Sequence, residues 1–153
     1  MYNYNALFIL LRYCLGVIFL YPIIYCSLYL NDKYRTLDYN KRCYIVKNLI
    51  KSAVLLYITL TSYSSILLPI LKNNWINKDL NDLAAIYVSN DIVGLLIIPK
   101  LPATTKFHHI TTTLLVLYSF SIDFTQENVG RWMFIYTFMS ILSFGVKKKS
   151  TKW

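Results

Sequence analysis

Residues 90–119 read NDIVGLLIIPKLPATTKFHHITTTLLVLYS, which are two apolar segments joined by a turn that contains Pro99 and Pro102. The first segment carries Asp91, and the second has the pair His108 and His109 near its start. An ionisable group is costly inside a membrane, so it usually faces a protein partner or a cavity. The stretch therefore predicts a membrane hairpin of two helices, each with polar groups directed into the protein.

The composition indicates a membrane protein. Of the 153 residues, 56% are hydrophobic and 15% are charged, whereas soluble domains have about 45–50% and about 25%. The apolar residues occur in blocks, and a span of the bilayer needs about 20 of them. The 14 tyrosines and three tryptophans suit the membrane interfaces, where rings with one polar edge are favoured.

We predict an all-α fold, in which residues 1–153 form a single transmembrane helical bundle of about five spans. The expected spans are residues 7–30, 52–71, 83–98, 107–122 and 129–146. Residues 31–51 are expected to form a polar loop that becomes basic and amphipathic before the second span.

The basic residues give the chain a net charge of +9 and predict its orientation. In the five-span arrangement, most Lys and Arg residues share one side of the membrane, in the segments 31–51, 99–106 and 147–152. Cytoplasmic loops are enriched in these residues, so we expect a cytoplasmic C-terminus. The sequence contains no basic helix interleaved with aromatic residues, so we do not expect a nucleic-acid partner.

The cysteines and glycines exclude several kinds of site. Cys14, Cys26 and Cys43 form no C-x-x-C pair, and two of them fall in the first expected span. A disulfide framework or a structural zinc site is therefore not expected. The sequence also has no phosphate-binding glycine loop, serine-nucleophile motif or zinc-protease motif. We expect no cofactor.

Asp91, His108 and His109 are the candidate catalytic residues. In an antiparallel hairpin, Asp91 would lie about 12 Å and His108 about 7 Å from the turn, so the two depths are similar. A direct or water-bridged contact fits the sequence but is not required by it, and such a pair could transfer protons. The alternative is that the histidines only form hydrogen bonds across the bundle near the membrane interface.

The spacing of the two histidines argues against a metal site. Adjacent residues point about 100° apart on a helix, whereas residues three or four positions apart share a face. His108 and His109 therefore do not converge readily on one ion, and we expect no bound metal.

The run HHITTTLLVLYSF, from His108 to Phe120, resembles the first half of the signature of the TLC domain, which is found in ceramide synthases. An acidic residue in the preceding helix, a Lys-x-Pro turn and a polar residue followed by Arg before the second span also resemble the smaller members of this family. In this chain they are Asp91, Lys100 with Pro102, and Asn40 with Arg42.

The resemblance implies a helical membrane bundle around an intramembrane cavity, with a role in lipid sensing, transport or modification. His108 and His109 would serve there as a general base or proton relay. Thr112, Ser119 and Arg42 would be lipid-binding residues. Membrane lipids are then the expected partners, and an endomembrane like the endoplasmic reticulum is the expected location.

The chain departs from the synthase signature after this run. It has Asp123, Gln126 and Asn128 where the family continues with Asn, Arg and Gly, and it lacks the later His-Asp-x-x-Asp stretch. These differences argue against acyl transfer to a sphingoid base. The alternative function is a non-enzymatic transmembrane subunit or scaffold of a membrane complex, with membrane-protein partners. A transporter is disfavoured because no internal repeat is found.

Overall fold

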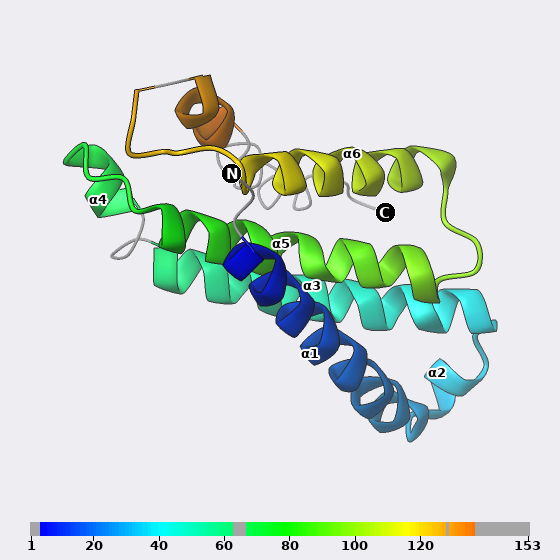
Figure 1. The fold of residues 1–153 in the computed structure, drawn as a ribbon. Coiled ribbons are helices and arrows are strands. Elements are labelled where there is room, and N and C mark those ends of the chain that lie inside the picture. Colours follow the sequence, from blue (N-terminus) through cyan, green and yellow to red (C-terminus); the bar gives the residue numbers. More distant parts are fainter. Residues whose placement is uncertain (1–3, 63–66, 128, 137–153) are drawn as a thin grey trace, which may run out of the picture.

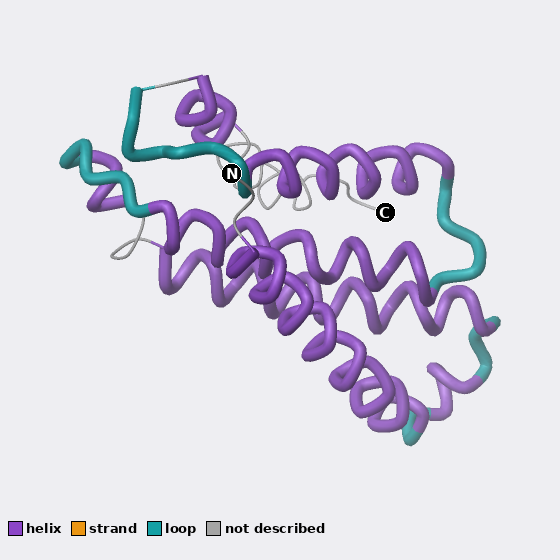
Figure 2. The backbone as a smooth tube through the Cα atoms, viewed as in Figure 1, coloured by secondary structure: helices purple, strands orange, loops and turns teal. Residues whose placement is uncertain are grey.

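The structure is a computed structural model, and it describes residues 4–62, 67–127 and 129–136. Within these ranges the chain forms helices and short connections, without strands, which confirms the all-α prediction (Figure 2). The helices are α1 (Tyr4–Tyr29), α2 (Asp32–Arg35), α3 (Tyr39–Ser62), α4 (Leu68–Leu71), α5 (Asn77–Ile97) and α6 (Ala103–Ser119). Residues 129–136 are also helical.

Helix α5 is the centre of the arrangement, because α1, α3 and α6 all pack against it. Figure 1 shows α3, α5 and α6 running alongside one another, with α1 oblique to α3 and α5. As a result α5 buries residues on several of its faces, and these include the polar residues Asn81, Ser89, Asn90 and Asp91. These four polar residues of α5 therefore meet protein rather than the surroundings of the bundle.

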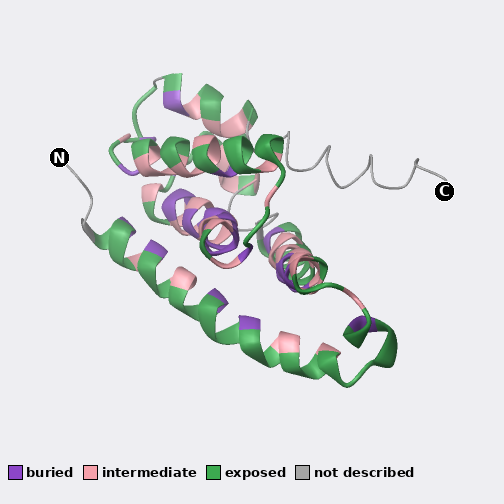
Figure 3. Ribbon diagram, turned by 90° about the vertical axis from the view of Figure 1, so that its right-hand side faces the viewer, coloured by how far each residue is buried: buried purple, intermediate pink, exposed green. Residues whose placement is uncertain are grey.

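Three helices are long and apolar enough to cross a membrane: Asn5–Tyr29, Tyr39–Thr61 and Asn77–Ile97. The outer face of α1 supports this assignment, since Phe8, Phe19 and Ile23 are 61–70% exposed there. Figure 3 shows the same face as an almost continuous exposed surface along α1. A continuous apolar face of this kind is unusual on a soluble monomer and suits contact with lipid.

The second and third spans begin earlier than predicted. Helix α3 begins at Tyr39 rather than at residue 52, so much of the segment predicted as a polar loop is helical. Its buried residues Cys43, Val46 and Ile50 recur at the three- and four-residue steps of a helix face. Packing of this face against α1 and α5 extends the helix through its basic residues.

The fourth and fifth predicted spans are not established by the structure. Helix α6 has 17 residues, which gives a length of about 25 Å, less than the roughly 30 Å of a hydrocarbon core. The predicted fifth span, residues 129–146, is described only as far as residue 136. Its remainder lies outside the described residues.

The first loop and the turn after α5 lie at the same end of the bundle. The Asn40 side-chain amide donates to the Lys100 carbonyl over 3.1 Å, and the Lys100 N–H donates to Asn40 Oδ1 over 3.0 Å. These two hydrogen bonds agree with the prediction that segments 31–51 and 99–106 lie on the same side of the membrane. We call this end, which carries Lys33, Arg35, Lys41, Arg42, Lys100 and Lys106, the basic end.

The opposite end is closed by hydrogen bonds around Asp123. The Asn77 amide donates to Asp123 Oδ1 over 2.7 Å, and the Phe124 N–H donates to Asn77 Oδ1 over 2.7 Å. The N–H and hydroxyl of Thr125 donate to the same Asp123 oxygen over 3.0 and 2.7 Å. These donors favour the charged carboxylate and hold the pKa of Asp123 below its ordinary value.

Acid should loosen this closure. Because the pKa of Asp123 is lowered in the folded state, the stabilisation is present at neutral pH and is lost as the pH falls through that lowered value. Protection factors for the Phe124 and Thr125 amides, measured by hydrogen exchange at about pH 6 and about pH 3, should fall with acid. The Asp123→Asn variant does not titrate there, so an equal fall in that variant would contradict the prediction.

Candidate functional site

Asp91 lies in α5 between groups from α3 and α6. Its Oδ2 accepts a hydrogen bond from Lys51 Nζ over 3.0 Å, and its Oδ1 faces His109 Nδ1 at 3.4 Å. The Asp91 side chain is only 1% exposed and that of His109 is 7% exposed. The structure therefore brings the predicted acid together with one of the two predicted histidines, away from the outer surface of the bundle.

The second ring nitrogen of His109 meets another lysine. His109 Nε2 lies 2.5 Å from Lys47 Nζ, and Lys47 is 4% exposed. Two nitrogen atoms in a hydrogen bond share one proton, so one of them must accept. Lys51, Asp91, His109 and Lys47 thus form a continuous line of groups, which we call the buried polar cluster.

His108 sits beside this cluster but is exposed. Its ring centroid lies 5.7 Å from that of His109, with 54° between the ring planes. One potential metal-ligand atom from each of Asp91, His108 and His109 lies within 4.8 Å of the other two. Adjacent histidines thus approach a common point more closely than the helical angle between them suggested, because side-chain torsions also decide where the ring nitrogens lie.

Lys47 and Lys51 are the site residues that the sequence analysis missed, since both were assigned to a solvated loop. The sequence did contain a signal for the burial of Lys47. The two lysines are four residues apart, and Lys47 follows Cys43 and precedes Ile50 by helical steps, so it lies in phase with apolar residues that are buried. Reading residues 39–51 as helix would have directed Lys47 inward.

The close approach of α3 to α5 depends on Gly94. A Cβ at Gly94 would lie 2.7 Å from Lys47 Cε, so the aliphatic part of the lysine occupies the space that a side chain would take. The Asn90 amide donates to the Lys47 carbonyl over 3.4 Å and links the same two helices. These contacts position the Lys47 amine beside His109.

The cluster lies at one depth in the bundle. Asp91 is six residues before the last residue of α5, Ile97, and His109 is six residues after the first residue of α6, Ala103. Each is therefore about 9 Å from the connecting turn. The ionisable groups lie inside the bundle, below the basic end.

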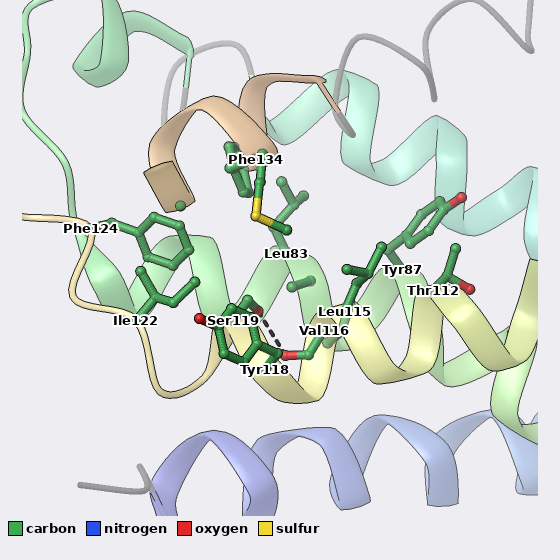
Figure 4. Close-up of a pocket in the computed structure, with 13 residues that line it drawn as sticks. Leu83, Tyr87, Thr112, Leu115, Val116, Tyr118, Ser119, Ile122, Phe124 and Phe134 are labelled. Atoms are coloured by element: carbon green, nitrogen blue, oxygen red, sulfur yellow. Dashed lines mark hydrogen bonds between the residues drawn. The ribbon is translucent and has the colours of Figure 1, made fainter. Parts of the chain in front are cut away.

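An apolar pocket of about 90 Å³ lies between α5, α6 and residues 129–136 (Figure 4). The lining is almost entirely apolar or aromatic and consists of Leu83, Ala84, Tyr87, Thr112, Leu115, Val116, Tyr118, Ser119, Ile122, Phe124, Gly130, Met133 and Phe134.

Two lining residues connect the pocket with the cluster. Lys51 Nζ donates to the Tyr87 carbonyl over 3.0 Å and lies 3.6 Å from the centre of the Tyr87 ring. The Thr112 hydroxyl lies 2.9 Å from the His108 carbonyl and 3.1 Å from that of His109. Tyr87 and Thr112 lie next to each other at one side of the pocket in Figure 4. The apolar space and the ionisable groups are therefore neighbours.

The predicted lipid-binding residues separate into two places. Thr112 and Ser119 line the pocket, but Arg42 does not. The Arg42 guanidinium lies 5.3 and 5.9 Å from the ring centres of Tyr29 and Tyr25, at the basic end. Arg42 therefore does not belong to the same site as Thr112 and Ser119.

No protein-family model matches the chain, and comparison with curated proteins and with solved structures finds no match. The resemblance to the TLC domain accordingly depends on the residues quoted for it.

Proposed function

We propose that the chain is a multi-pass membrane protein of TLC-domain type with a lipid-related role. The observation that carries the proposal is the position of the apolar pocket directly beside the buried polar cluster. A short apolar segment of a lipid would occupy the pocket. The polar part of the same molecule would meet the groups around His109.

The cluster suits proton transfer. A neutral imidazole accepts a proton at one nitrogen and releases one from the other, and His109 has Asp91 at Nδ1 and Lys47 at Nε2. In this proposal His109 is part of a proton relay between Lys47 and Asp91, and Asp91 orients its ring. His108 stands at the exposed edge, where an incoming lipid headgroup would first meet the site.

The wider membrane arrangement is part of the same proposal. We infer about five spans, with α6 and residues 129–146 added to the three candidate spans. The basic end would face the cytoplasm together with the C-terminal residues, because basic segments are retained on that side. An endomembrane like the endoplasmic reticulum is the proposed location.

Filling the pocket tests lipid binding. Val116 lines the pocket, whereas Leu114, two residues away on α6, is 61% exposed. We expect the Val116→Phe variant, purified in mild detergent, to retain several-fold less lipid by mass spectrometry than the matched Leu114→Phe variant, because only the first occupies the pocket. Equal lipid retention in the two variants would contradict the proposal.

The role of the histidines is tested in cells. In a cell that depends on the wild-type chain for its lipid composition, His109→Ala should change that composition while lipid still binds in the pocket. If neither His108→Ala nor His109→Ala alters the composition, the histidines have no part in lipid handling.

The alternative is a membrane subunit without a reaction of its own, and the exposed apolar face of α1 favours it as a second candidate. Partner helices would cover this face in place of lipid. Native mass spectrometry separates the two functions. A stoichiometric partner complex that carries no lipid would indicate the subunit, and a lone chain that retains lipid would support the lipid-handling protein.

A further inference from the structure

We propose that Asp91, His108 and His109 bind a divalent metal ion, and that the ion is zinc. This reverses the expectation drawn from helical spacing. The inference does not depend on the lipid role, because metal binding can be measured without any lipid substrate.

Two buried atoms without hydrogen-bond partners provide the first argument. Asp91 Oδ1 and His109 Nδ1 are both shielded from solvent and lie 3.4 Å apart, but neither forms a hydrogen bond with the other or with another described residue. An unsatisfied buried polar group costs about 1–3 kcal/mol, and a bound ion is one of the explanations for such a group. Here the two atoms face each other, so one ion would satisfy both.

The distance between these atoms provides the second argument. Zinc ligands lie about 2.0–2.2 Å from the ion, so two ligands of a tetrahedral site are about 3.4 Å apart. Asp91 Oδ1 and His109 Nδ1 are separated by 3.4 Å. Neighbouring ligands of an octahedral ion at about 2.1 Å would be about 3.0 Å apart. The separation therefore fits tetrahedral zinc better than magnesium, and the two imidazoles favour zinc further.

His108 supplies the third ligand. One ring nitrogen of His108, one carboxylate oxygen of Asp91 and one ring nitrogen of His109 lie within 4.8 Å of one another. The His108 side chain is exposed, so a change of rotamer toward the ion displaces no packed core. Two histidines and one carboxylate leave a fourth position open, as in catalytic zinc sites. A water molecule or a carbonyl or carboxylate oxygen would fit that position.

A lysine contacts the second polar atom of each buried ligand side chain. Lys51 donates to the second oxygen of Asp91, and Lys47 contacts the second nitrogen of His109. Such contacts to the far atom fix the orientation of a metal ligand. Zinc at Nδ1 leaves the ring proton of His109 on Nε2, so Lys47 must lose its own proton and accept this hydrogen bond when the ion binds. That proton release and the positive charge of Lys51 oppose the cation, so we expect weaker zinc binding than at structural sites with thiolate ligands.

Metal analysis of the full chain tests the site. The protein is purified in detergent with an affinity tag that lacks histidine, incubated with zinc chloride, desalted and analysed by inductively coupled plasma mass spectrometry. We expect about one zinc ion per chain in the wild type and at least a tenfold loss in His108→Ala. Because His108 is exposed, this variant keeps the packed interior of the bundle.

Matched variants and a spectroscopic probe identify the ligands. Asp91→Asn should lose zinc, whereas Asp79→Asn, on the same helix outside the cluster, should keep it. Cobalt(II) in place of zinc should give the visible spectrum of a tetrahedral ion without thiolate charge-transfer bands, which excludes the three cysteines as ligands. Less than about a tenth of a zinc ion per wild-type chain, or equal zinc in wild type and His108→Ala, would overturn the proposal.

Discussion

Asp91→Asn should lower the free energy of unfolding by about 3–5 kcal/mol, the usual cost of removing one member of a buried ion pair. The reason is that the carboxylate is 1% exposed and lies between Lys51 and His109. Its neutral replacement leaves the lysine ammonium in the interior without a counter-charge. Denaturation by increasing SDS mole fraction in mixed micelles, followed by circular dichroism, measures the loss.

The Lys51→Met substitution provides the control for this interpretation. When both partners are replaced by uncharged groups, no buried charge is left alone, so the double variant should be more stable than the sum of the two single effects predicts. Asp79→Asn should change the stability by about 0.5 kcal/mol or less. If the Asp91 and Lys51 effects are additive, the two residues do not form a stabilising pair.

Phe124→Ala should be the second large effect, about 3–5 kcal/mol. Phe124 is 2% exposed and belongs to a cluster of buried residues with Ile58, Trp75, Leu80 and Leu83. Its ring contacts Phe134 edge to face, with 6.0 Å between the ring centres. Truncation creates a cavity where the connection after α6 packs against α5, so the variant should unfold at a lower SDS mole fraction.

Phe107→Ala is the matched control, because Phe107 lies on α6 but is 74% exposed. It should cost far less than Phe124→Ala in the same titration. Phe124 also lines the pocket, so its truncation should enlarge the pocket and leave lipid retention intact. Equal stability of the two variants would show that the Phe124 cluster contributes little to the fold.

The hairpin was predictable because its sequence allows few arrangements of the two helices. Two prolines close together fix the turn, and a constant rise per residue then sets the depth of each polar side chain. This argument placed Asp91 and the histidine pair at similar depths, and in the structure Asp91 meets His109. It left open which histidine would turn inward, since that depends on how α6 is rotated against α5.

The lysine partners were not predicted, for a physical reason. Hydropathy counts Lys47 and Lys51 as polar wherever they occur, but a lysine can bury its stem when its amine finds an acceptor. Here the acceptors come from residues at least 36 positions away along the chain. Local sequence does not contain this information, and the same error placed the start of the second span too late.

Arg42 shows what a family resemblance cannot predict, which is the position of a residue in space. The family resemblance grouped it with Thr112 and Ser119, but a motif gives the order of residues and not their place in space. The aromatic rings of Tyr25 and Tyr29 hold Arg42 at the basic end, on helices other than those that line the pocket.

The packing of α1 on α5 has a consequence for biosynthesis. Ala6 and Leu10 are buried against Ala85 and Val88, and about eighty residues of chain separate these partners. At about 5–20 residues per second of translation, roughly 4–16 seconds pass between the synthesis of Ala6 and Leu10 and that of their partners on α5. During that interval this part of α1 lacks its α5 partner, so we expect its apolar composition alone to keep it inserted.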